Sequence, residues 1–370
     1  MALDIRTILT LAVELKASDV HLTVGVPPFF RVNGELLPLG KTGKGTITAY
    51  QPGTDFAGEE VAEPLSGDDV ERLIQELMDK KSLGRFLVDG ECDFAFSLPG
   101  AGRFRVNCFR QRGSPAAAIR LINTAIPSLR ELGLPPVVKK LARLLDGLIL
   151  VTGPTGSGKS TTLAAMIDFI NNERSCHIIT LEDPIEYLHR HKRSIVNQRE
   201  IGNDSKTFAS ALRAALREDP DVIFVGEMRD LETTRIALNA ADTGQLVLAT
   251  MHTPNATLTV NRIIDMFPPH QQGQIRVQLA GVLQGVIAQQ LIPRADGKGR
   301  ALAVEVLVAN PAVRNLIREG KTHQMPSVLQ TGSRHGMISF EKSIRRLYSS
   351  GLISRAEMQL RVGEAELAQT

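Results

Sequence analysis

The feature that most constrains this chain is a glycine-rich stretch near its middle, residues 147–162, with the sequence GLILVTGPTGSGKSTT. It begins with an apolar run typical of a buried strand, and a helix is expected after the glycines. Between them lies the pattern G-x-x-x-x-G-K-[ST], in which backbone N–H groups turn toward phosphate oxygens and the helix N-terminus adds positive charge. The predicted phosphate-binding residues are Gly153, Pro154, Thr155, Gly156, Ser157, Gly158, Lys159, Ser160 and Thr161.

Two side chains of this loop have specific predicted roles. The ammonium group of Lys159 can reach the β- and γ-phosphates of a nucleotide, and the hydroxyl of Ser160 can bind Mg²⁺. The sequence therefore predicts a site for ATP with Mg²⁺.

Length and composition limit what else the chain can be. Its 370 residues are enough for two domains with a small C-terminal appendage. A formal net charge of +3 is too weak to indicate nucleic acid or an anionic membrane as the partner. Three scattered cysteines without a CxxC pair argue against a disulfide framework or a zinc site, which suits the cytosol. Without an export signal or an apolar run long enough to span a bilayer, we expect no direct membrane insertion.

The first 122 residues are predicted to form an α+β domain. Asp4 can cap a helix over 4–16, and a second amphipathic helix is expected over 66–78. Alternation of polar and apolar residues predicts five strands, at 18–24, 29–33, 92–98, 102–112 and 115–122. Asn33 and Gly34 indicate a hairpin turn after the second of these strands.

Two segments of this half lack lasting periodicity. Residues 40–64 are rich in Gly, Thr and Glu and are predicted to form an exposed loop inserted in the domain. Residues 123–136 contain three prolines and a glycine, which indicates an interdomain linker.

The strand over 102–112 carries a stripe of arginines. Its apolar residues Phe104, Val106 and Cys108 share one face, while Arg103 and Arg105 share the other. Such a stripe is usually a solvated face. Beside a phosphate-binding loop it can also supply positive charge to the γ-phosphate in a neighbouring subunit. Further candidates of this kind are Arg110, Arg112 and Arg120.

From residue 137 to about 300 strands and helices alternate, which indicates a mostly parallel α/β sheet. Strands are expected near 148–152, 177–182, 195–199, 221–226 and 246–251. Helices are expected near 159–172, 205–218, 231–243, 256–266 and 271–290. Residues 301–370 are predicted to be mostly helical, with one strand near 302–308.

Acidic residues follow two of these strands, where ligands of open α/β sheets bind. The apolar strand DVIFVG ends in Glu227, whose carboxylate can hold Mg²⁺ through water beside the glycine-rich loop. Glu182, Asp183 and Glu186 follow another strand, and a carboxylate there can polarise a water for attack on the γ-phosphate. Three acids so close can also form a surface turn, so the sequence leaves open which of them faces the water.

A third strand ends in His252. A histidine at a strand end is more often a capped or core residue than a catalytic one. Beside two acidic strand ends, however, it can sense the γ-phosphate or relay the nucleotide state.

Four segments in this order closely resemble the ATPases of type II and type IV secretion systems. They are GPTGSGKST (the Walker A motif), TLEDPIEY (the Asp box), DPDVIFVGEMRD (Walker B) and LATMHTPNA (the His box), spread over about 147–268. Near the start, SDVHLT is also similar to this family. Toward the end, AVRNLIRE (312–319) with GKTHQM behind it resembles the pilus retraction motors of the family, whose extension and secretion members carry a tetracysteine zinc module.

The resemblance implies a RecA-like ATPase domain preceded by a PAS-like N-terminal domain, assembled as a homohexamer. It implies cytoplasmic ATPase rings at the inner membrane, held there by the pilus platform protein, that depolymerise the pilin filament. By motif position it makes Glu186 the favoured general base and Glu227 the Mg²⁺-linked acid, with Glu182 and His252 beside them. The interfacial arginines would be Arg103, Arg105 and Arg112.

The chain departs from the family in two places. Gln245 stands in the Thr-Gly-Gln turn where relatives often have histidine, and a glutamine cannot titrate. The segment 40–64 is also longer than expected for a retraction motor. Leu316 and Ile317 lie among charges, which is typical of an amphipathic helix packed on the ATPase domain.

Two other classes of function stay open at this point. A RecA-like core can drive a nucleic-acid motor, but that class needs a basic, aromatic groove, and the chain has no Trp and three Tyr. A subunit that binds ATP without hydrolysing it is also conceivable, and the acids Glu186 and Glu227 argue against it. A related secretion or pilus-assembly ATPase is the nearest alternative.

Overall fold

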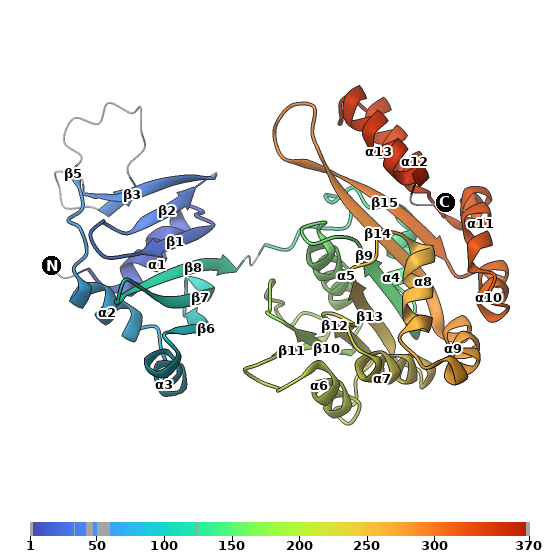
Figure 1. Ribbon diagram of the computed structural model, residues 1–370, viewed down its shortest axis with the longest axis horizontal. Helices are drawn as coiled ribbons and strands as arrows, with labels where there is room; N and C mark the ends of the chain where they lie inside the picture. Colours follow the sequence, from blue (N-terminus) through green and yellow to red (C-terminus); the bar gives the residue numbers. More distant parts are fainter. Residues whose placement is uncertain (1–2, 33, 42–46, 50–59, 123–124, 368–370) are drawn as a thin grey trace. The chain divides into compact units, whose positions relative to one another are not determined.

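The computed structural model describes residues 3–32, 34–41, 47–49, 60–122 and 125–367. The chain divides into two compact units, Met1–Thr124 and Ala125–Thr370 (Figure 1). Within the described residues no helix is long and apolar enough to cross a membrane.

The first unit is an antiparallel sheet with helices packed on it. Its helices are α1 (Ile5–Glu14), α2 (Gly67–Gln75) and α3 (Lys80–Asp89). Its strands are β1 (Asp19–Leu22), β2 (Phe29–Val32), β3 (Glu35–Lys41), β4 (Ile47–Ala49), β5 (Glu60–Val61), β6 (Glu91–Leu98), β7 (Gly102–Gln111) and β8 (Ser114–Ile122). They lie in the order β4-β3-β2-β1-β8-β7-β6, with β5 paired to β3.

The predicted elements of this unit are present. Asp4 caps α1, because its side chain accepts the N–H of Thr7 at 2.7 Å. Of the segment 40–64, residues 42–46 and 50–59 lie outside the described residues, as does the hairpin residue Asn33. The described remainder includes the end of β3 and the short strands β4 and β5, which both pair with β3, so the segment is not a loop throughout as predicted.

The second unit is a seven-stranded sheet in the order β11-β10-β12-β13-β9-β14-β15. Its strands are β9 (Gly147–Thr152), β10 (His177–Glu182), β11 (Ile195–Glu200), β12 (Val222–Val225), β13 (Leu246–Met251), β14 (Leu283–Pro293) and β15 (Arg300–Val308). All neighbours are parallel except β14 and β15, which form an antiparallel hairpin.

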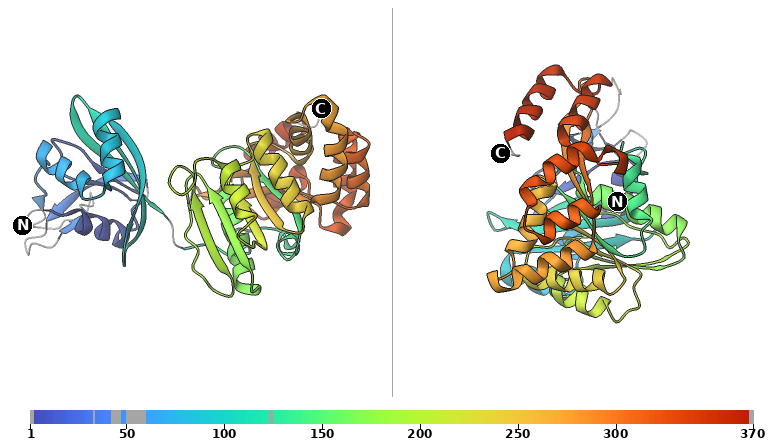
Figure 2. Two further views of the ribbon diagram at one scale, coloured as in Figure 1. Left: turned by 90° about the horizontal axis from the view of Figure 1, so that it is seen from below. Right: turned by 90° about the vertical axis from the view of Figure 1, so that its right-hand side faces the viewer.

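Helices cover both faces of this sheet (Figure 2). They are α4 (Pro136–Ala142), α5 (Lys159–Glu173), α6 (Phe208–Ala215), α7 (Leu231–Asp242), α8 (Ala256–Asp265), α9 (Pro269–Val282), α10 (Pro311–Arg318), α11 (Met325–Thr331), α12 (Phe340–Ser349) and α13 (Arg355–Leu367). Residues of β9 alternate between the two cores: Leu148 and Leu150 pack with α7 to α10, and Ile149 and Val151 pack with α4 and α5. Because both faces are covered, the strand reads as a continuous apolar run.

The single helix predicted over 271–290 is wrong. The helix ends at Val282, and the chain continues as β14, which pairs with β9 on one side and β15 on the other. Residues 282–288 (VLQGVIA) are mostly apolar, so they fit a buried helix and a buried strand equally well, and periodicity cannot separate the two. Gly285 permits the strand, since a Cβ there would lie 3.0 Å from the Leu307 carbonyl oxygen and a Leu141 methyl.

The last helices pack on the same unit. In α10, Ile317 and Val313 are fully buried in the core beneath α9. Arg314 ties the two helices together, since its guanidinium donates to the carbonyls of Ala280 and Gly281, both at 2.6 Å. A cation placed on the last carbonyls of α9 also interacts favourably with the helix dipole.

Candidate active site

The phosphate-binding loop follows β9 and leads into α5. Gly153 has φ 141°, and a Cβ at this position would collide with the Gln289 carbonyl oxygen of β14 and the Ser157 hydroxyl. Gly158 takes the left-handed conformation (φ 89°) directly before Lys159, the first residue of α5. Glycine is therefore needed at both ends of the loop, and the loop lies against β14.

The side chains within the loop fit a phosphate ligand. Lys159 is 9% exposed, and its ammonium group donates to the Gly153 carbonyl at 2.9 Å and the Pro154 carbonyl at 3.0 Å. Burial lowers the pKa of Lys159, and the nearby carboxylates Glu227 and Glu186 oppose that shift. The Ser157 hydroxyl is buried and finds no hydrogen-bond partner in the described part of the chain. The Ser157 hydroxyl is therefore available to a phosphate oxygen, and the ammonium group of Lys159 keeps its third donor for another.

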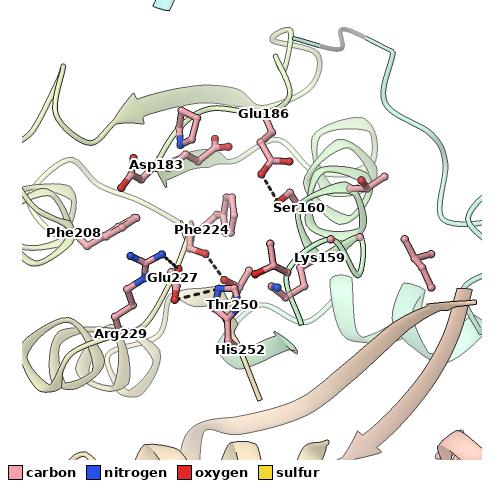
Figure 3. Close-up of a pocket in the computed structure, with 18 of the residues that line it drawn as sticks. Lys159, Ser160, Asp183, Glu186, Phe208, Phe224, Glu227, Arg229, Thr250 and His252 are labelled. Atoms are coloured by element: carbon pink, nitrogen blue, oxygen red, sulfur yellow. Dashed lines mark hydrogen bonds and ion pairs between the residues drawn. The ribbon is translucent and has the colours of Figure 1, made fainter. Parts of the chain in front are cut away.

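A cavity of about 480 Å³ opens in front of this loop (Figure 3). The loop forms one wall, and the carboxyl ends of β10, β12 and β13 form the other. Of the predicted residues it is lined by Thr155, Gly156, Gly158, Lys159, Ser160, Thr161, Glu182, Asp183, Glu186, Glu227 and His252. The fold thus brings the four motif segments to one edge of the sheet.

Glu186 lies at the loop side of the cavity. Its carboxylate accepts a hydrogen bond from the Ser160 hydroxyl at 2.9 Å, which Figure 3 shows as a direct contact. Thr161 and Tyr187 share a second hydrogen bond of 2.9 Å, so residues 186 and 187 both face the first turn of α5. The carboxylate of Glu186 is therefore placed beside the hydroxyl predicted to bind Mg²⁺.

Glu182 has a different environment. It is 8% exposed, and one carboxylate oxygen accepts from the Thr180 hydroxyl at 2.6 Å and from the Gln198 amide at 3.0 Å. Burial raises the pKa of Glu182 to about 7, and the two hydrogen bonds only partly offset this.

Glu227 is held by two basic side chains. One carboxylate oxygen lies 2.6 Å from the Arg229 guanidinium and the other 3.3 Å from His252 Nε2 (Figure 3). Burial raises the pKa of Glu227, but the hydrogen bond from Arg229 and the charges of His252 and Arg229 outweigh it, so the pKa is lowered. The predicted Mg²⁺-linked acid is therefore ionised, and His252 contacts it directly.

Sequence reasoning missed several cavity residues. Arg229 stands two positions after Glu227, so its place in the Walker B segment is the signal that could have found it. Thr250 donates its hydroxyl to the Gly226 carbonyl and so joins β13 to the end of β12. Arg300 lies 140 positions beyond Ser160, and only the β14–β15 hairpin brings its guanidinium to 3.5 Å from the Gly156 carbonyl.

The predicted arginines belong to the first unit. Phe104, Val106 and Cys108 of β7 are fully buried, and Arg105 on the opposite face lies 3.8 Å from Asp93. Arg112 sits exposed in the turn between β7 and β8 with φ 49°. The alternation predicted for this strand is therefore confirmed, while the role of Arg103, Arg105 and Arg112 stays a prediction.

Gln245 lies at the other end of the sheet from the cavity. Its carbonyl accepts the N–H of Gly147 at the start of β9, and its side chain accepts from the Thr243 hydroxyl at 2.8 Å. Within the second unit this glutamine therefore stands apart from the phosphate-binding loop.

The site offers few protein ligands to a metal ion. In the described ranges no cluster of three or more His, Cys, Asp or Glu side chains could hold one. Mg²⁺ does not need such a cluster, because it keeps several waters and binds through one or two protein groups and the phosphates of its nucleotide. The Ser160 hydroxyl and the Glu227 carboxylate, both lining the cavity, fit that requirement.

The buried Glu182 gives stability a pH dependence. Its pKa is about 7 in the folded chain against an ordinary value of 4.5, so between these values only the folded chain holds the proton. The free energy of unfolding therefore includes the full contribution of Glu182 below about pH 4.5. It falls by about 3 kcal/mol as the pH rises to about 7.

We expect the melting temperature of Glu182→Gln, relative to the wild type, to rise from pH 5 to pH 8, because glutamine does not titrate. Differential scanning fluorimetry checks this, and a constant difference contradicts it.

Comparison with known proteins agrees with these observations. A family model described as type II/IV secretion system protein matches residues 88–359. The chain is 44% identical over 353 residues to the type IV pilus retraction ATPase PilT of Pseudomonas aeruginosa, covering 95% of this chain and 96% of that protein. It is 48% identical over 302 residues to a twitching motility protein of Neisseria gonorrhoeae, covering 82% and 81%.

A solved structure agrees equally well. The crystal structure of the pilus retraction motor PilT with bound ADP matches with a TM-score of 0.84 and 49% identity over 96% of both chains. This likeness confirms the predicted fold class, an α/β ATPase domain preceded by a smaller α+β domain. The family model, the relatives and this structure together show that the chain belongs to the type II/IV secretion system protein family.

Proposed function

We propose that this chain is a motor ATPase that hydrolyses ATP to power the retraction of type IV pili. One observation carries the proposal: Lys159, Ser160, the acids of two strand ends and the histidine of a third line a single cavity. The chain that holds this cavity is 44% identical to a pilus retraction ATPase over 95% of its length.

The cavity residues divide the work of hydrolysis. The loop N–H groups and Lys159 bind and orient the phosphates, and the ionised Glu227 with Ser160 would hold Mg²⁺. The metal, when bound, neutralises charge on the phosphate oxygens. Glu186, beside Ser160, accepts the proton of the attacking water. His252 contacts the carboxylate of Glu227 and passes movements of that carboxylate on to the residues that follow it in the chain.

Other parts of the chain serve the assembly. We propose a homohexamer in which Arg103, Arg105 and Arg112 supply positive charge to a neighbour's nucleotide. The ring would work at the cytoplasmic side of the inner membrane, docked on the pilus platform protein, and pilin would be its indirect partner. The nucleic-acid alternative gains no support, because the relatives reported above are a pilus retraction ATPase and a twitching motility protein.

Deletion of the encoding gene in its native host tests the proposal. The mutant cells should be hyperpiliated and unable to twitch, and the wild-type gene should restore both phenotypes. Lys159→Ala should not restore them, because the phosphates lose their buried cation. The matched control Lys140→Ala, exposed on α4, should restore them. Normal pilus number and motility after the deletion would reject the assignment.

A further inference from the structure

A buried carboxylate outside the cavity joins two helices of the ATPase unit. Glu305 lies in β15 and is 5% exposed. One of its oxygens accepts the N–H of Ala256 at 2.9 Å, and the backbone N–H of Phe340 faces the carboxylate and lowers its pKa. These two residues are the first of α8 and of α12. A single side chain therefore lies at the starts of two helices that are far apart in sequence.

Moving a carboxylate from water into a buried site costs free energy unless hydrogen bonds and positive charge compensate it. Burial raises the pKa of Glu305 to about 7, and the N–H groups of Ala256 and Phe340 oppose the shift. The two helix N-termini supply the partial positive charge that the carboxylate needs. The buried carboxylate of Glu305 is therefore stabilised only when both α8 and α12 begin next to it.

One of the two helices begins next to the active site. Only Thr253, Pro254 and Asn255 separate His252 from Ala256. The Thr253 hydroxyl lies 2.7 Å from that of Thr259 in α8, which in turn lies 3.5 Å from that of Thr152 at the end of β9.

The segment 252–256 is thus held at three points. His252 contacts Glu227 at 3.3 Å, the threonine hydroxyls contact the strand that carries the phosphate-binding loop, and Ala256 is held by Glu305. Only the last of these ties reaches the edge hairpin and the C-terminal helices.

We propose that Glu305 is a positioning residue of the ATPase site: by holding the first residue of α8 it keeps His252 against Glu227. The inference rests on the proposed ATPase function, because it assigns Glu305 a part in turnover. Through Phe340 the same carboxylate makes the position of His252 depend on α12, which packs on β15.

Glu305→Gln is the first test. The amide keeps the shape of the side chain but presents one oxygen to two N–H groups, so one of them loses its acceptor. We expect kcat for ATP to fall about tenfold, less than the roughly hundredfold that a misplacement of about 1 Å can cost, with KM changed less than about twofold. The control is Glu341→Gln, which removes the same charge from α12 at a surface pair with Arg345. Its kcat should equal that of the wild type.

A double-mutant cycle separates positioning from general support. In a His252→Ala background, Glu305→Gln should lower kcat by less than about twofold, because the group it positions is gone. A second route removes the same hydrogen bond from the other side. Ala256→Pro deletes the N–H donor at a position where proline suits a helix, and it should reproduce the fall in kcat if Glu305→Gln does not fold.

The outcomes distinguish the two levels of the proposal. Absence of turnover in the wild-type protein overturns the proposed function and this inference with it. Turnover in the wild type with an unchanged kcat in Glu305→Gln overturns the inference alone. So does a tenfold fall that persists in full in the His252→Ala background.

Discussion

Glu186→Gln is expected to lower ATP turnover by at least about a hundredfold while leaving MgATP binding intact. The carboxylate of Glu186 accepts a hydrogen bond from Ser160 at 2.9 Å and so lies beside the hydroxyl that is proposed to bind Mg²⁺. Glutamine keeps a hydrogen-bonding oxygen there but cannot accept a proton from water. Phosphate release at saturating MgATP measures the loss, and binding of a fluorescent ATP analogue checks that the site still fills.

Glu182 is the competing candidate for the general base. It lines the same cavity, and its pKa of about 7 suits a group that takes up a proton near neutral pH. The carboxylate of Glu182 is nevertheless held in place, because Thr180 and Gln198 both donate hydrogen bonds to one of its oxygens. We expect Glu182→Gln to keep more than a tenth of the wild-type turnover. The reverse result, with Glu186→Gln active and Glu182→Gln inactive, would transfer the role to Glu182.

The parts of the site that sequence reasoning predicted are those in which chemistry is tied to local spacing. Lys159 and Ser160 follow their glycines at fixed positions, and Glu227 and His252 each end an apolar strand. In a parallel sheet the carboxyl ends of neighbouring strands meet at one edge, so these residues converge without any knowledge of the packing.

The parts that escaped prediction depend on contacts between distant segments. The helix predicted over 271–290 failed because an apolar run has no periodicity once both faces of a strand are buried, and β14 is such a strand. The β14–β15 hairpin brings Arg300 to the Gly156 carbonyl, and predicting a helix in place of β14 hid this contact. The raised pKa of Glu182 arises from burial, which spacing along the chain does not reveal.

The AVRNLIRE helix α10 shows how the structure sharpens a prediction about function. Leu316 and Ile317 are its apolar centre, but Ile317 is fully buried in the core and Leu316 packs against the same core. Ile317→Ala would leave a cavity and cost about 2 to 5 kcal/mol, so loss of retraction in that variant would only report unfolding. The exposed face of the helix, which carries Asn315 and Arg318, is the better place to test its role.

We expect Asn315→Ala with Arg318→Ala to abolish retraction while ATP turnover stays within about twofold of the wild type. Neither side chain is in the core or lines the cavity, so the change in stability should stay near 0.5 kcal/mol. Pilus number, twitching and phosphate release are the measurements. The matched control is Lys342→Ala with Arg346→Ala, two exposed positions on α12, which should retract normally. If both double variants retract, the solvent face of α10 has no part in coupling hydrolysis to movement, and the motif acts through its buried residues alone.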